Sequence, residues 1–134
     1  FFGEKDYQPL RIVRRIARDL DIPIDVIGCP TIREEDGLAM SSRNLLLSDR
    51  SRIHAPVLAE VMEDMREKLR DGALMTDILP NAKTRILAAG FNDVDYLQLR
   101  DGSDLSLLDT KKPDARLFAA AWLAGVRLID NIAV

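Results

Sequence analysis

A short segment near the start of the chain joins an apolar stretch to a helix and carries groups suited to phosphate. It consists of Gly3, Glu4, Lys5 and Asp6. Helix N-termini present unpaired backbone N–H groups and the positive end of the helix dipole, so they favour anions. Gly3 would let a ligand approach the backbone closely, Lys5 would supply a cation for phosphate oxygens, and Asp6 would accept hydrogen bonds from ribose hydroxyls. The alternative interpretation is structural: Lys5 is solvated and Asp6 caps the helix.

A second polar segment consists of Met40, Ser41, Ser42, Arg43 and Asn44. Hydroxyls, loop amides and a forked guanidinium match the geometry of a phosphate or pyrophosphate group. A flexible loop with such donors can close over a transferring phosphoryl centre and stabilise the charge that develops there. The alternative interpretation is a polar connection with an exposed arginine. Neither segment is specific by itself.

The elements around the first segment follow a strand–helix–strand order. Apolar residues recur every three or four positions over residues 5–20, which predicts an amphipathic helix with Asp6 as its N-cap and Pro9 in its first turn. Residues 1–3 are expected to end a buried strand, and residues 22–28 to form another short, buried one. This order predicts a parallel sheet.

The rest of the chain changes character. Residues 30–47 show no periodicity, and an irregular stretch of that length in a compact chain is often functional. Helices and then an antiparallel sheet are expected beyond it. The expected helices begin after Ser48 and cover 58–71 and 76–90; the expected strands are 94–100, 117–123 and 126–133, the last two joined as a hairpin at Ala124-Gly125. The fold class is therefore α/β that passes into α+β.

Composition places the chain among ordinary globular proteins, with 134 residues, 47% hydrophobic residues, 31% charged residues and a net charge of −3. These values exclude a disordered tail and a strongly basic nucleic-acid binder. No apolar run reaches the ~18 residues that a membrane span needs. The single cysteine permits no intrachain disulfide, which fits a reducing compartment such as the cytoplasm. Cys29 and Trp122 are expected to be buried and His54 to lie on the surface. The charged turn at 33–36 is expected to be solvated, and the alternative is that its acidic groups contact Mg²⁺.

Taken together, the two polar segments resemble the pantothenate synthetase (pantoate–β-alanine ligase) family. The matching stretches are residues 2–8 and 33–44, and Lys5 and Arg43 are 38 positions apart, as in that family. The resemblance continues through 120–123 and 127–131, so it covers the whole chain but only the C-terminal half of the family's usual length. It implies that residues 1–47 are the terminal portion of a Rossmann-like nucleotidylyltransferase domain with its phosphate-binding loop. Residues 48–134 are then a C-terminal α+β domain, and the family's His-x-Gly-His-type motif is expected upstream of Phe1.

The resemblance implies an enzyme that performs a two-step ligation. The carboxylate of pantoate attacks the α-phosphate of Mg²⁺-ATP, which gives pantoyl adenylate and pyrophosphate. The amine of β-alanine then attacks the acyl carbon and releases pantothenate and AMP. Met40 to Arg43 correspond to the superfamily's Lys-Met-Ser-Lys-Ser loop, with the basic group displaced to Arg43. The implied catalytic residues are Lys5, Ser41, Ser42 and Arg43. The implied ATP-binding residues are Gly3, Glu4, Lys5, Asp6, Ile32, Met40, Ser41, Ser42 and Arg43. No side chain is expected to be a metal ligand.

One position departs from the family pattern. The family usually has two consecutive glutamines after Asp-Tyr or Asp-Phe, and the second contacts pantoate, whereas this chain has Gln8-Pro9. Proline has no side-chain donor, so the pantoate contact is missing or has moved to Gln8. Loss of one hydrogen bond to a charged group costs about 1.5–3 kcal/mol. We therefore expect a raised KM for pantoate.

Two other functions remain open at this point. One is another adenylyl- or cytidylyltransferase of the same superfamily, which β-alanine-dependent AMP release would distinguish. The other is a non-catalytic nucleotide-binding or dimerisation module. The resemblance implies a cytoplasmic protein that is a homodimer at full length and binds neither nucleic acid nor membrane. The chain alone is expected to be inactive, because half of the ATP site would lie upstream.

Overall fold

The computed structural model describes residues 1–134, which form two compact units, Phe1–Ile32 and Arg33–Val134. The predicted domain boundary between residues 47 and 48 stays a prediction, and the segment 33–47 belongs to the second compact unit. None of the helices combines the length and the apolar character that a membrane crossing requires.

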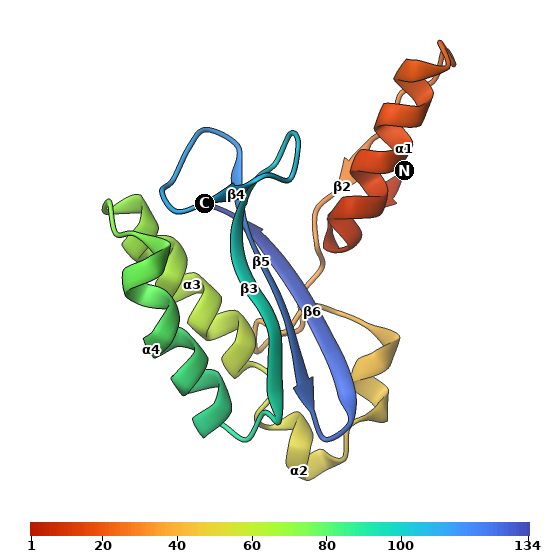
Figure 1. Cartoon of the computed structure of the whole chain (residues 1–134). Helices are drawn as coiled ribbons and strands as arrows, with labels where there is room; N and C mark the ends of the chain where they lie inside the picture. The colour runs from red at the N-terminus through yellow and green to blue at the C-terminus, as the bar shows by residue number, and fades with distance from the viewer. The chain divides into compact units, whose positions relative to one another are not determined.

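The first unit has the predicted strand–helix–strand order. Strand β1 (Phe2–Gly3) pairs in parallel with β2 (Gly28–Cys29), and the 3₁₀ turn η1 (Glu4–Asp6) leads into helix α1 (Tyr7–Asp19) (Figure 1). The parallel pairing and the helix confirm the expected βαβ fragment.

Helix α1 packs against the chain that precedes and forms β2. Leu10 and Ala17 are buried, and Arg14 Nε donates to the carbonyl oxygen of Val26 at 2.9 Å. A Cβ on Gly28 would lie 3.0 Å from both the Glu4 carboxylate and the Leu10 side chain. Only glycine lets the helix start and β2 approach each other this closely.

Four expectations for the first unit were wrong in detail. Regular pairing covers only residues 28–29 instead of 22–28, because β1 offers just two residues as a partner. Phe1 and Phe2 are exposed within this chain, and Cys29 is half-buried. Asp6 occupies the N-cap position, but its side chain makes no cap hydrogen bond. Because η1 runs directly into α1, Asp6 lacks the extended backbone that an N-cap normally adopts.

The second unit contains three helices and a four-stranded antiparallel sheet, as the sequence predicted in outline. The elements are η2 (Ser42–Leu46), α2 (Asp49–Arg52), α3 (Val57–Arg70), α4 (Met75–Ala88), β3 (Asp93–Asp101), β4 (Leu107–Leu108), β5 (Ala115–Leu123) and β6 (Val126–Ala133). Two of these short elements, η2 and β4, had not been expected. The strand order in the sheet is β4-β3-β5-β6.

Helices α3 and α4 cover one face of this sheet and form the core with it (Figure 1). Alternate residues of β5 from Ala115 to Leu123 point into this core, as the period of two requires. Trp122 falls on the other phase and is 36% exposed, so its predicted core position was wrong. Its indole N–H donates to the Asp95 carboxylate at 3.0 Å. The predicted β5–β6 hairpin turns at Ala124 and Gly125, which both have positive φ.

Candidate functional site

The first polar segment lies where β1 ends and α1 begins, as predicted. Gly3 is the last residue of β1, and Glu4 to Asp6 form the 3₁₀ turn that leads into α1. Gly3 has an ordinary extended backbone (φ −67°, ψ 132°), and a Cβ placed on it would meet nothing within 4 Å. The fold of this unit therefore does not require a glycine at position 3. The close approach of a ligand to the backbone would explain the glycine at this position.

The side chains of this segment are accessible to a ligand. Glu4 and Lys5 are half-buried, whereas Asp6, Gln8 and Pro9 are exposed. The structural interpretation of Asp6 as a helix cap was wrong, since its carboxylate makes no cap hydrogen bond.

Ile32, the last residue of the first unit, is largely exposed. The first-unit candidates are thus Gly3 to Asp6 and Ile32, while Met40 to Arg43 lie in the second unit.

The second polar segment forms an exposed arch between two buried ends. Leu38 and Ala39 are buried before it, and Asn44 is buried after it. Between these ends, Met40 is 52% exposed, Ser41 is half-buried, and Ser42 and Arg43 are exposed. We call residues 40–43 the arch.

The arch ends in the 3₁₀ helix η2, which Ser41 caps. Ser41 Oγ accepts from the backbone N–H of Arg43 at 3.3 Å, and the Ser41 carbonyl accepts from Asn44 N–H at 3.0 Å. Serine in the extended conformation is a preferred residue at this position. The arch therefore presents two hydroxyls and a guanidinium from a locally ordered backbone. The expectation of an irregular loop was wrong for residues 42–46, which form this 3₁₀ helix.

A tight turn at residues 33–39 holds the first end of the arch. Arg33 and Ala39 form an antiparallel bridge, and Glu34 N–H donates to the Leu38 carbonyl at 2.8 Å. Gly37 turns the chain with φ at 87°, a conformation that favours glycine. The charged residues of this turn are therefore placed by backbone geometry.

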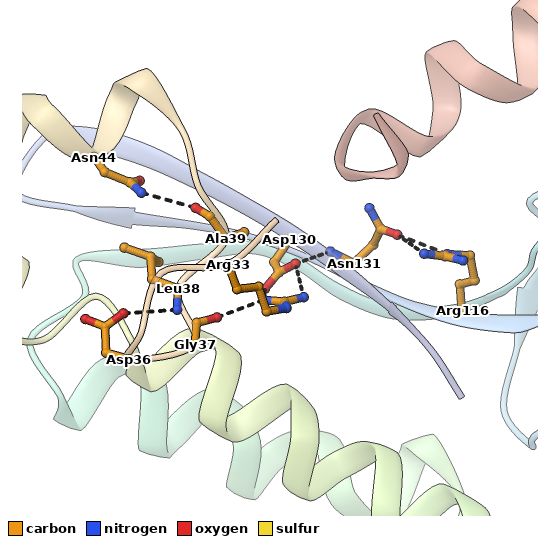
Figure 2. A network of polar contacts seen from close by, with 9 residues as sticks. All are labelled: Arg33, Asp36, Gly37, Leu38, Ala39, Asn44, Arg116, Asp130 and Asn131. Carbon is orange, nitrogen blue, oxygen red and sulfur yellow. Dashed lines mark hydrogen bonds and ion pairs between the residues drawn. The ribbon is translucent and has the colours of Figure 1, made fainter. Parts of the chain in front are cut away.

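The turn is attached to the sheet through Arg33 and Asp130. Arg33 donates two hydrogen bonds to the Asp130 carboxylate, at 2.7 and 2.9 Å, and a third to the Gly37 carbonyl at 2.9 Å (Figure 2). Asp130 is buried on β6 and also accepts from the backbone N–H of Asn131 at 2.7 Å. The hydrogen bond with Asp130 raises the pKa of Arg33 above its usual range. The expectation of a solvated charged turn was therefore wrong for Arg33.

The acidic side chains of the turn are also paired. Arg52 on α2 donates to Glu34 at 3.2 Å and to Asp36 at 2.7 Å. Hydrogen bonds from Asn44 and then Arg52 hold the pKa of Glu34 below its usual range, and the hydrogen bond from Arg52 does the same for Asp36. These carboxylates are thus held by neighbouring side chains and are not only solvated.

Asn44 was named in the sequence only as a member of the second polar segment. Arg52 and Asp130, which also hold the arch, were not singled out as site residues. Asp130 gave a signal, because residues 126–132 alternate as a half-buried strand and a carboxylate at an inward position needs a partner. Arg52 gave none, since an arginine on a short helix is ordinarily solvated. No group of three or more His, Cys, Asp or Glu side chains is arranged to hold a metal ion.

Comparison with known proteins decides the family. The model of the family "Pantoate-beta-alanine ligase" matches residues 1–133. The chain belongs to this family. Pantothenate synthetases from Roseobacter denitrificans and Chelativorans sp. are 63% and 54% identical to it, and each match covers 100% of this chain and 47% of the relative.

Solved structures of the ligase family share the fold. Pantothenate synthetase from Thermus thermophilus superposes with a TM-score of 0.89 at 43% identity, covering 98% of this chain and 48% of that chain. The pantoate-beta-alanine ligase from Francisella tularensis, complexed with beta-gamma ATP and beta-alanine, has a TM-score of 0.70 at 30% identity and covers 98% and 42%. This chain therefore spans about half the length of the relatives it matches. The predicted family and fold class are confirmed.

Proposed function

We propose that this chain supplies part of the ATP site of an enzyme that joins pantoate and β-alanine to form pantothenate. Membership of the pantoate-beta-alanine ligase family supports the reaction. The observation that carries the role of this chain is the arch. Its hydroxyl and guanidinium groups are accessible, whereas Ala39 and Asn44 at its two ends are buried. Polar donors displayed from fixed ends are suited to bind a charged group.

The proposed chemistry follows the two steps of the ligation. In the first step the carboxylate of pantoate bonds to the α-phosphorus of ATP, and the bond to the pyrophosphate oxygen breaks. Lys5 and Arg43 offset the negative charge that develops on the α-phosphate and the departing pyrophosphate, and Ser41 and Ser42 donate hydrogen bonds to phosphate oxygens. In the second step the β-alanine nitrogen bonds to the acyl carbon, and AMP leaves with the electron pair.

The remaining ATP contacts are assigned to Gly3, Glu4, Asp6, Ile32 and Met40. The open space around Gly3 supports close approach of the nucleotide to the backbone. The exposed carboxylate of Asp6 is proposed to accept hydrogen bonds from ribose hydroxyls, because the helix cap does not use it. Ile32 and Met40 are exposed apolar side chains that are proposed to contact the nucleotide.

Magnesium fits this proposal as a companion of ATP. Mg²⁺ keeps several waters and is bound largely through substrate phosphates, so it needs few protein ligands. When bound, the ion would neutralise part of the phosphate charge, and the roles of Lys5 and Arg43 do not depend on its position.

The pantoate contact is assigned to the exposed Gln8 and Pro9 at the start of α1. The family resemblance further supports a homodimer in the cytoplasm. Sedimentation of the protein encoded by the gene would measure its oligomeric state.

The test of the proposed function is the formation of AMP by the gene-encoded protein. We expect AMP release to require ATP, pantoate and β-alanine together, and Lys5→Met and Arg43→Met to lower kcat by about 10²–10³. Arg50→Met is the matched control for Arg43, because Arg50 is an exposed arginine on the neighbouring helix α2. It should leave kcat within about twofold of the wild type.

Two other results would contradict the proposal. Nucleotidyl transfer to an acceptor other than pantoate, without AMP release that depends on β-alanine, would indicate another enzyme of the superfamily. ATP binding without AMP release, together with an intact mass equal to that of this chain, would indicate a nucleotide-binding module.

A further inference from the structure

Asn44 combines burial with a location among exposed residues. It is 6% exposed, whereas Leu45 and Leu46, which follow it in η2, are 86% and 71% exposed. This reverses the usual preference of polar and apolar side chains for the surface and the interior. A buried polar side chain must find hydrogen-bond partners, so the partners of Asn44 indicate why it is buried.

The amide of Asn44 joins the two ends of the arch. Its nitrogen Nδ2 donates to the carbonyl oxygen of Ala39 at 3.1 Å and to the Glu34 carboxylate at 2.9 Å (Figure 2 draws the first of these). Both partners only accept hydrogen bonds, so the nitrogen and not the oxygen must face them. Ala39 directly precedes the arch and Asn44 directly follows it. The side chain thus fixes the separation of the two ends.

The first end is fixed in turn to the rest of the second unit. Ala39 is bridged to Arg33, whose guanidinium is held by Asp130 on β6. Glu34, the second acceptor of Asn44, is also held by Arg52 on α2. Both acceptors of the Asn44 amide therefore sit in positions set by the sheet and by a helix. The arch itself is left without a role in the core, since Met40, Ser42 and Arg43 are exposed.

We propose that Asn44 is a positioning residue for nucleotide binding. It fixes the ends of the arch so that Ser41, Ser42 and Arg43 are already arranged before phosphate arrives. This inference rests on the proposed function, in which the arch binds the phosphates of ATP. Ordering a binding segment in advance removes the entropy loss that would otherwise oppose binding. Small displacements of positioned groups have large effects on affinity and rate.

The test measures ATP affinity and steady-state kinetics of the gene-encoded protein. Asn44→Ala removes both hydrogen bonds, and Asn44→Asp keeps the shape but replaces the donor with an acceptor that faces Glu34. The matched control is Asn92→Ala. Asn92 also holds a backbone group in the second unit, because its Oδ1 accepts from Ala124 N–H at 2.9 Å in the remote hairpin.

We expect both Asn44 variants to weaken ATP binding and raise the KM for ATP by about 10- to 100-fold. The KM for β-alanine should change by less than about twofold, and Asn92→Ala should leave ATP affinity unchanged. The Asn44→Asp variant adds a pH signature. Its introduced carboxyl lies beside another carboxylate, and in the protonated form it can donate again. Its ATP affinity, relative to the wild type at the same pH, should recover as the pH falls through the pKa of the introduced carboxyl, which Glu34 raises and the neighbouring Arg52 lowers.

Three outcomes would overturn the inference. Unchanged ATP affinity in folded Asn44 variants would show that the hydrogen bonds of Asn44 between the two ends of the arch do not affect ATP binding. Failure of both variants to fold, with Asn92→Ala folded, would assign Asn44 to stability alone. Absence of ATP binding by the wild type would contradict the proposed function itself, and this inference with it.

Discussion

Arg33 and Asp130 lie 97 positions apart in the sequence and meet through two hydrogen bonds, at 2.7 and 2.9 Å. The Asp130 side chain is 3% exposed and that of Arg33 is 27% exposed. Two parallel N–H···O bonds fix both the distance and the angle between guanidinium and carboxylate. This pair therefore sets the orientation of the 33–39 turn on β6, and with it the first end of the arch.

Removing one member of this pair should destabilise the second unit. Arg33→Ala leaves the Asp130 carboxylate buried without its cation, and breaking such pairs costs about 3–5 kcal/mol. We expect about 3 kcal/mol, because Arg33 is partly exposed to solvent. Chemical denaturation measures the loss. Lys68→Ala is the control, since its ion pair with Asp64 lies on the surface and should cost less than about 1 kcal/mol. Equal losses in the two variants would contradict the structural role of Arg33.

The pairs made by Arg52 predict a pH dependence of stability. The pKa values of Glu34 and Asp36 are lowered from their ordinary values of 4.5 and 3.8. A lowered carboxylate pKa stabilises the folded state above the ordinary value, and this contribution is lost as the pH falls through the lowered value. The wild type should therefore be more stable than Arg52→Gln at neutral pH, and the difference should shrink below about pH 4.5.

Denaturation midpoints of the two proteins across this pH range measure the effect. A difference that stays constant down to about pH 3 would contradict the assignment.

The sequence predicted the elements of this chain better than the contacts that place the arch. Helices α3 and α4 and strand β3 follow from apolar periodicity, because each is long enough to show a period of 3.6 or 2. Strand β5 follows from a continuous apolar run of strand length, and β6 from the hairpin turn that precedes it. The strand expected at 22–28 is replaced by the two-residue β2, because strand pairing depends on the length of the partner strand β1 as well as on composition. Trp122 was misplaced because an unbroken apolar run does not reveal which phase faces the core.

The candidate site was predictable only in its exposed parts. Ser41, Ser42 and Arg43 stand in the sequence as a recognisable polar group. The residues that hold them come from distant elements: Arg52 from α2 and Asp130 from β6. A local pattern can show that Asp130 is buried, but it does not show which residue pairs with it, because the spacing between such partners is set by the whole fold.

Gly3 offers a test that separates fold from ligand binding. A methyl group at this position meets nothing within 4 Å, and the backbone conformation suits any residue. Gly3→Ala should therefore leave stability unchanged or raise it by about 0.4–1 kcal/mol. If ATP approaches this backbone as proposed, the added methyl should weaken ATP binding by about tenfold or more.

Titration calorimetry with ATP and thermal unfolding measure the two effects. Gly125→Ala should show the opposite pattern, with lowered stability and unchanged ATP affinity, because Gly125 has φ at 78° in a remote turn. Unaltered ATP affinity in Gly3→Ala would contradict the proposed approach.

The proposed contact with pantoate can be tested at Pro9. This residue is exposed in the first turn of α1, where its missing N–H has no helical partner to lose. Substitution should therefore leave the helix intact. Pro9→Gln restores a side-chain donor, and one hydrogen bond to a charged group is worth about 1.5–3 kcal/mol, so the KM for pantoate should fall about tenfold or more. Pro9→Ala removes the ring without adding a donor and should leave this KM unchanged. If the KM for pantoate is the same in Pro9→Gln and the wild type, position 9 does not contact pantoate and the assignment is wrong.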